Sequence, residues 1–189
     1  MARKYELKRR AEQQQETRRR IVKAAIDLHR TKGPARTSLS DVARLAGVQR
    51  HTLYRHFPNE RELGLAWSGR YLEEHPPPDA AAWQSIADPA ARLRRGLADL
   101  YEFYETAEDM LSCVLRDAQF DPLTREMFEL RAGGSMANVH RVLAEPLRGR
   151  RVLAALDLAL DFHSWRRLAE SGLSREEAVE TMVAAIFCQ

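Results

Sequence analysis

One short segment of the chain, residues 49–56, gathers side chains that could recognise nucleic acid. It carries an amide, guanidinium groups, imidazoles, a hydroxyl and a phenol, which can donate to or accept from base edges and phosphates. These candidates are Gln49, Arg50, His51, Thr52, Tyr54, Arg55 and His56. The same residue types also occur on ordinary solvated helices, so their meaning depends on the elements that carry them.

Two short helices joined by a turn would present this segment outward. Ser38 followed by Asp41 predicts a capping box, in which Asp41 takes the place of the usual Glu. Ala43 is small enough to let a second helix cross closely, and Gly47 can turn without steric penalty. Leu53 would lie beneath the second helix. The pattern predicts a helix-turn-helix, with a plain helical hairpin as the alternative.

Charge is distributed unevenly along the 189 residues. Residues 1–70 hold 17 Lys and Arg and 7 Asp and Glu, whereas residues 71–189 hold 13 Arg and 20 Asp and Glu. A basic head on an acidic body favours polyanion binding at one end, although a solvated basic tail would give the same count. The basic N-terminal arm would cover residues 1–18, and we expect the basic side chains of residues 3–20 to add phosphate or minor-groove contacts.

The rest of the chain predicts helices, because no stretch alternates apolar and polar residues as strands do. A helix-turn-helix domain would cover residues 19–58. A linking helix at 59–78 would stop at the proline run, and a helical body would cover 79–189. Within the body the expected helices are 89–104, 110–119, 122–147 (with an interruption at Gly133-Gly134), 151–170 and 174 onward. The fold class is therefore all-α.

Several functional classes find no support in the sequence. No nucleophile elbow, zinc-protease motif or phosphate loop is present, so we expect no enzyme, no cofactor and no metal. No apolar run approaches the roughly 18 residues that span a bilayer, and the charged N-terminus is not a secretory signal. Cys113 and Cys188 form neither a metal-ligand spacing nor a disulfide framework, which fits a cytoplasmic protein.

Residues 20–65 resemble the N-terminal domain of the TetR family of bacterial transcriptional regulators. The resemblance is carried by Asp-Val-Ala at 41–43, Ala-Gly-Val at 46–48 and Thr-Leu-Tyr-Arg-His-Phe at 52–57, in the order and spacing of the family. It implies a nine-helix TetR-like fold, with a three-helix DNA-binding domain, a linking fourth helix and a C-terminal ligand-binding and dimerisation domain. It also implies a homodimer on a palindromic double-stranded DNA operator.

The resemblance assigns roles within the DNA-binding domain. The recognition helix would face the major groove, with Tyr54 and His56 on phosphates, and Thr37 or Ser38 would contact a backbone phosphate. Three residues depart from the family pattern. Gln49 stands where Ser is frequent, His51 where a small residue is frequent, and Glu60 where many members carry a phosphate-binding Lys. The Glu60 carboxylate would repel phosphate, and the neighbouring Arg61 could compensate for this repulsion.

The resemblance further implies an effector cavity and a dimer seam in the body. The candidates for the cavity wall, any of which could instead be ordinary core, are Trp67, Tyr101, Tyr104, Arg116 and His163. The candidates for the seam, unless their stripe merely closes the protomer core, are Leu156, Leu160, Val179, Met182, Val183 and Ile186. The usual mode of the family is repression released by a small molecule, here unidentified. A non-specific DNA-binding protein and an activator of the same fold are the alternatives.

Overall fold

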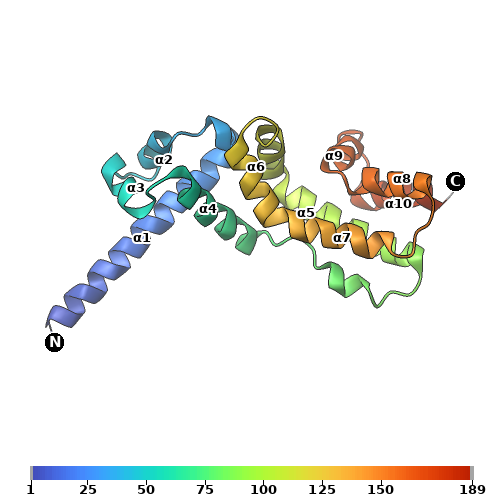
Figure 1. Cartoon of the computed structure of the whole chain (residues 1–189), viewed down its shortest axis with the longest axis horizontal. Coiled ribbons are helices and arrows are strands. Elements are labelled where there is room, and N and C mark those ends of the chain that lie inside the picture. The colour runs from blue at the N-terminus through green and yellow to red at the C-terminus, as the bar shows by residue number, and fades with distance from the viewer. Residues whose placement is uncertain (1, 188–189) are drawn as a thin grey trace. The chain divides into compact units, whose positions relative to one another are not determined.

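The computed structural model describes residues 2–187, with side chains for residue 6 and residues 8–187, so Cys188 lies outside it. Every regular element in that range is helical (Figure 1), which confirms the all-α prediction. The α-helices are α1 (Ala2–Thr31), α2 (Leu39–Leu45), α3 (Arg50–His56), α4 (Glu60–Glu74), α5 (Pro89–Asp117), α6 (Pro122–Phe128), α7 (Gly134–Ala144), α8 (Arg150–Leu160), α9 (Phe162–Glu170) and α10 (Arg175–Phe187). Two 3₁₀ turns, η1 (Pro34–Arg36) and η2 (Ala80–Trp83), and a π-helical turn, η3 (Glu129–Gly133), complete the set.

The chain forms two compact units. Unit 1 comprises Met1–Glu74 and Asp109–Glu129, and unit 2 comprises His75–Glu108 and Leu130–Gln189. The helix-turn-helix segment therefore shares a unit with the end of α5 and with α6. No local sequence signal indicates that these later residues belong with the head.

Helix boundaries in the body differ from the sequence-based expectation at two places. The helices expected at 89–104 and 110–119 are one helix, α5, because residues 105–109 contain no glycine or proline to end it. The helix expected at 151–170 is divided at Asp161, whose side chain accepts from the Ser164 N–H at 2.7 Å and caps α9. Counting α6, η3 and α7 as one interrupted helix, the described residues form the expected nine.

Two buried tyrosines of unit 2 account for the division between α8 and α9. The Tyr101 hydroxyl donates to the Ala159 carbonyl at 3.0 Å, and the Tyr104 hydroxyl donates to the Leu160 carbonyl at 2.6 Å. The last carbonyls of a helix lack partners within that helix. These hydroxyls supply partners from α5, so α8 can end inside the unit without leaving buried carbonyls unpaired.

In unit 1, a buried carboxylate fixes the loop between α1 and α2. Asp117, at the end of α5, is 0% exposed. One of its oxygens accepts the Ala35 N–H at 3.0 Å, and the other accepts from Arg116 Nε at 2.8 Å. Arg116 Nη2 also donates to the Lys32 carbonyl at 2.9 Å. Gly33 passes this pair at φ +96°, where an added Cβ would overlap both side chains.

The start of α2 is held by the predicted capping box, which the structure confirms. The Asp41 N–H donates to Ser38 Oγ at 3.1 Å, and the Ser38 N–H donates to the Asp41 carboxylate at 3.2 Å. That carboxylate also accepts from Lys32 Nζ at 2.8 Å and from Arg44 Nη2 at 2.9 Å. Hydrogen bonds from Lys32, Arg44 and Ser38, in that order of effect, hold the pKa of Asp41 well below its usual range.

Replacing Gly33 with Ala is expected to destabilise the protein by about 3 kcal/mol or more, because it adds a steric clash to backbone strain. Gly149 is the matched control. Its backbone (φ 101°, ψ 139°) resembles that of Gly33 (φ 96°, ψ 156°), but no atom lies within 4 Å of an added Cβ. Gly149→Ala should therefore cost only the strain, about 1–3 kcal/mol. Urea unfolding measures the free energy of unfolding of both variants. Equal losses in the two would contradict a steric clash at Gly33.

The Asp41 carboxyl is expected to stay ionised at a pH where ordinary aspartates, with a pKa of about 3.9, are half protonated. Because its pKa is lowered in the folded state, its contribution to stability is present above the unfolded pKa. That contribution is lost as the pH falls through the folded value. An NMR titration of the side-chain carboxyl measures this. Lys32→Gln should raise the pKa more than Arg44→Gln, and an ordinary wild-type pKa would refute the account.

Candidate nucleic-acid interface

The packing of α2 and α3 presents the recognition segment outward. Ala43 and Leu53 are buried between the helices, at 4% and 0% exposure. Gly47 turns the chain at φ +64°, and the Val48 N–H closes the turn on the Ala43 carbonyl at 3.0 Å. Each of these residues has the place that the helix-turn-helix pattern predicted.

The outer face of α3 carries most of the predicted recognition residues. Those that are exposed are Gln49, Arg50, His51, Tyr54 and Arg55, whereas Thr52 and His56 are half-buried. Arg50 Nη2 donates to the Tyr54 hydroxyl at 3.1 Å, and its guanidinium lies 5.5 Å from the Tyr54 ring centre. This contact holds a guanidinium and a phenol side by side on one exposed face.

The N-terminus of α3 is weakly capped. Gln49 is the N-cap residue, with extended backbone angles, and its side chain makes no capping hydrogen bond. With Gln49 in place of the Ser that is frequent at this position, α3 therefore begins without a side-chain cap. Its amide is available to an outside partner instead of being used by the helix.

Thr37 and Ser38 lie at the start of α2, but their hydroxyls already have partners within the chain. Thr37 Oγ1 donates to the Gly33 carbonyl at 2.7 Å, and Ser38 Oγ lies 2.9 Å from the Asp41 carboxylate. A phosphate contact through either hydroxyl would have to replace one of these bonds.

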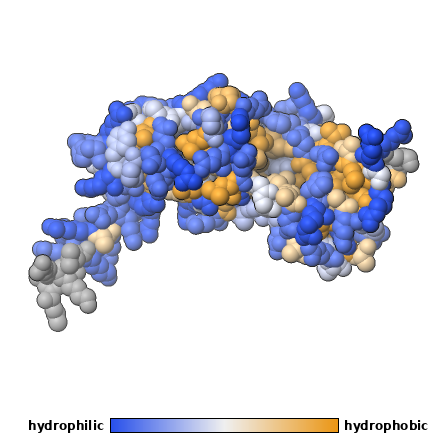
Figure 2. Space-filling view, in the orientation of Figure 1, coloured by the Kyte–Doolittle hydropathy of each residue, from blue (hydrophilic) through white to orange (hydrophobic). Residues whose placement is uncertain are grey.

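The basic arm continues α1, which is 30 residues long and begins at Ala2. Its described surface is hydrophilic (Figure 2). A groove between α1 and the end of α3 is lined by Arg10, Gln13, Gln14, Glu16, Thr17, Arg20, Arg55 and His56. The Arg18 guanidinium packs 4.3 Å from the centre of the Phe57 ring, which ties α1 to the end of α3. The guanidinium groups of Arg10, Arg20 and Arg55 therefore line the groove between the arm and α3.

His56 differs electrostatically from its neighbours on α3. Burial, followed by the nearby Arg55 and Arg18, lowers the pKa of His56, and its Nε2 has no hydrogen-bond partner. These surroundings favour the neutral form of the imidazole in the free protein.

The first turn of α4 carries one basic side chain, Arg61, between two glutamates. Glu60 lines a small cavity of unit 1. Arg61, which the sequence suggested as a substitute, donates from Nε to Glu126 of α6 at 2.8 Å. Because Arg61 is already paired with Glu126, it does not offer an unpaired charge to a phosphate in place of a lysine at position 60.

The five residues suggested for an effector wall divide between the two units. In unit 1, Trp67 packs edge-on to His29 at 4.6 Å between ring centres, and Arg116 belongs to the Asp117 contact. In unit 2, Tyr101 and Tyr104 are buried with their hydroxyls on α8 carbonyls, whereas His163 is exposed beside Phe162. All but His163 thus have a structural role of their own.

The apolar stripe suggested for a dimer seam lies in the core of unit 2. Leu156, Leu160, Val179, Val183 and Ile186 are each at most 8% exposed in the single chain, and Met182 is half-buried. The large apolar side chains of α8 and α10 that are exposed are instead Leu158 at 61% and Phe187 at 43%. The stripe therefore closes the protomer core, which is the alternative left open above.

Metal-binding and membrane-spanning features are both missing from the part of the chain that the structure describes. Its residues contain no group of three or more His, Cys, Asp or Glu side chains that could hold a metal ion. No helix in that range is long and apolar enough to cross a membrane.

Comparison with known proteins identifies the head of the chain. Residues 21–66 match the family model described as bacterial regulatory proteins, tetR family. The HTH-type transcriptional regulator TtgR of Pseudomonas putida is 36% identical over 96 residues, which cover 50% of this chain and 46% of that protein. The match therefore spans about half the length of this relative.

Solved structures extend the likeness in fold over most of the chain. HlyIIR, a hemolysin II transcriptional regulator, has a TM-score of 0.65 at 16% identity, covering 91% of this chain and 97% of that one. The multidrug binding protein EbrR has a TM-score of 0.53 at 25% identity, covering 89% and 94%. The curated relatives that match are described as transcriptional regulators. The N-terminal part of the chain, residues 21–66, is therefore similar to the DNA-binding segment of bacterial regulatory proteins of the tetR family, and the chain as a whole shares the fold of such regulators.

Proposed function

We propose that the protein binds double-stranded DNA through α3 and regulates transcription in the cytoplasm. The observation that carries the proposal is the exposed face of α3. There Gln49, Arg50, His51 and Tyr54 project from a helix whose opposite side, at Leu53, is fully buried. A helix that is narrow enough for the major groove and carries such donors and acceptors can distinguish base pairs directly.

The finer proposal is a ligand-released repressor that binds a palindrome as a homodimer. The similarity to regulators of the tetR family supports the dimer, in which two recognition helices would lie about 34 Å apart, one turn of DNA. With the predicted stripe in the core, the exposed Leu158 and Phe187 are better candidates for the seam. The description of EbrR as a multidrug binding protein supports a small-molecule effector. A non-specific DNA-binding protein and an activator remain the alternatives.

Selection of bound sequences from a random DNA pool at about 150 mM salt tests DNA recognition. We expect one palindromic motif. Arg50→Ala should weaken binding to it by about 1–3 kcal/mol and relax the preference at one position in each half-site. Arg70→Ala is the matched control, since Arg70 is exposed on α4 and pairs with Glu73 and Glu74.

The outcomes separate the alternatives. Tight binding without an enriched motif would support a non-specific DNA-binding protein. An enriched motif that Arg50→Ala and Arg70→Ala affect equally would remove α3 from recognition. A motif without two-fold symmetry would contradict the dimer.

The helical arm is expected to contribute phosphate contacts that depend on salt. Replacing Lys8, Arg9 and Arg10 with Gln keeps the helix but removes three charges. The slope of log affinity against log salt should fall by about 0.9 for each lost phosphate contact. Arg94→Gln with Arg95→Gln, in unit 2, should leave the slope unchanged. If the arm variant also keeps the wild-type slope, the arm does not contact DNA.

A further inference from the structure

Unit 1 contains a small cavity that is lined by none of the α3 residues proposed to recognise DNA. It has a volume of about 130 Å³ and lies among the end of α1, η1, the start of α2, α4 and α6. An engineered cavity of about 150 Å³ in another protein holds benzene, so this one has room for a small organic molecule. Leu63, Trp67 and Met127 contribute to its apolar wall.

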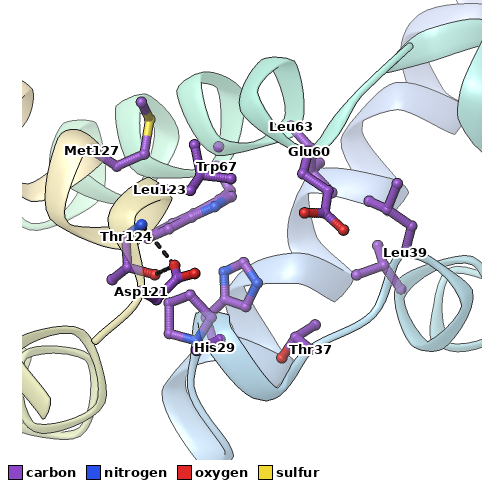
Figure 3. A pocket seen from close by; sticks show the side chains of 14 residues that line it. His29, Thr37, Leu39, Glu60, Leu63, Trp67, Asp121, Leu123, Thr124 and Met127 are labelled. Atoms are coloured by element: carbon purple, nitrogen blue, oxygen red, sulfur yellow. Dashed lines mark hydrogen bonds between the residues drawn. The ribbon is translucent and has the colours of Figure 1, made fainter. Parts of the chain in front are cut away.

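One lining side chain, His29, has a polar atom with nothing to bind. His29 is 6% exposed, and its Nδ1 has no hydrogen-bond partner. The imidazole projects among the lining side chains (Figure 3). Burial lowers the pKa of His29 to about 4, so the ring is neutral at pH 7 and one of its nitrogens is a hydrogen-bond acceptor. Buried polar atoms without partners are rare, so this nitrogen points to a missing partner.

The other charged groups of the cavity are carboxylates. Glu60, from the first turn of α4, points into the same space as the imidazole (Figure 3). Asp121 accepts from the Thr124 N–H at 2.8 Å. No lysine or arginine belongs to the lining, and Glu60 is exposed at the surface while also lining the cavity. The cavity is therefore rich in acceptors and lacks a balancing cation.

We propose that this cavity binds a small primary amine in its protonated form. The ammonium group donates to His29 Nδ1 and to the Glu60 carboxylate, and the alkyl chain packs on Leu63, Trp67 and Met127. An ammonium carries three donors and no acceptor, which matches a site that offers acceptors. An anion would be repelled by Glu60 and Asp121. A metal ion is disfavoured because the described residues hold no cluster of three ligands.

The site is independent of the proposed DNA contacts, since its binding can be measured without DNA. Titration of n-butylamine at pH 7 is followed by the ¹⁵N resonances of the His29 ring and by calorimetry. We expect saturable binding with a dissociation constant of about 1 mM, which five non-hydrogen atoms can support. The probes n-butanol, which has no charge, and butyrate, which has the opposite charge, match it in length.

Glu60→Gln supplies the decisive variant, and Glu62→Gln is its control. Both glutamates lie in the first turn of α4, but only Glu60 lines the cavity. Glu60→Gln should weaken n-butylamine binding about fivefold, as loss of a partly exposed ion pair does, whereas Glu62→Gln should leave it unchanged. The alcohol should bind the wild-type protein about fivefold more weakly than the amine, and butyrate should not bind.

Three results would overturn the proposal. The His29 resonances could fail to shift in a saturable way, which would indicate a cavity filled by water alone. The two glutamate variants could weaken binding equally, which would leave only a general charge effect. The alcohol could bind as tightly as the amine, which would make the site merely apolar.

Discussion

The buried carboxylate of Asp117 is the interaction on which the head of the molecule depends. A carboxylate at 0% exposure is costly unless it is paired and hydrogen-bonded. Asp117 meets this requirement through its neighbour Arg116 and through the Ala35 N–H in the loop that precedes α2. Removal of either partner would leave a buried charge uncompensated. The register of α1 against α2 is thus set by a residue more than seventy positions further along the chain.

This constraint explains several residue choices that local patterns leave open. Gly33 is required both by its φ of +96° and by the side chains beside it. Arg116 satisfies Asp117 and the Lys32 carbonyl together, so it has a structural role in the loop. Cys113, one turn earlier on α5, lies 3.6 Å from the Arg30 carbonyl, and Arg30 itself pairs with Asp109 at 2.7 Å. The last turns of α5 are therefore bound to α1 along their length.

The sequence predicted local features well because their causes lie within a few residues. Ser38 and Asp41 cap α2, Gly47 turns the chain, and Leu53 lies beneath α3, as their spacing indicated. Long-range features escaped prediction for a physical reason. The stripe of α8 and α10 has the same periodicity whether it faces a second chain or its own core, and only burial distinguishes them. The break at Asp161 depends on tyrosines some fifty-six residues away. Neither His29 nor the cavity that it lines has a motif.

Glu60 lies both in the first turn of α4 and in the lining of the cavity. A carboxylate in the first turn of a helix is favoured by the helix dipole, so Glu60 and Glu62 both stabilise α4. That benefit explains an acidic residue in the turn, but it applies equally to the two positions. Only Glu60 faces the cavity, and a negative charge at that end of α4 opposes phosphate, since Arg61 is paired with Glu126. Helix stability alone therefore does not account for the position of Glu60. The proposed amine site gives that position a role of its own, because the exposed Glu60 carboxylate and the neutral His29 imidazole are acceptors lining the same cavity.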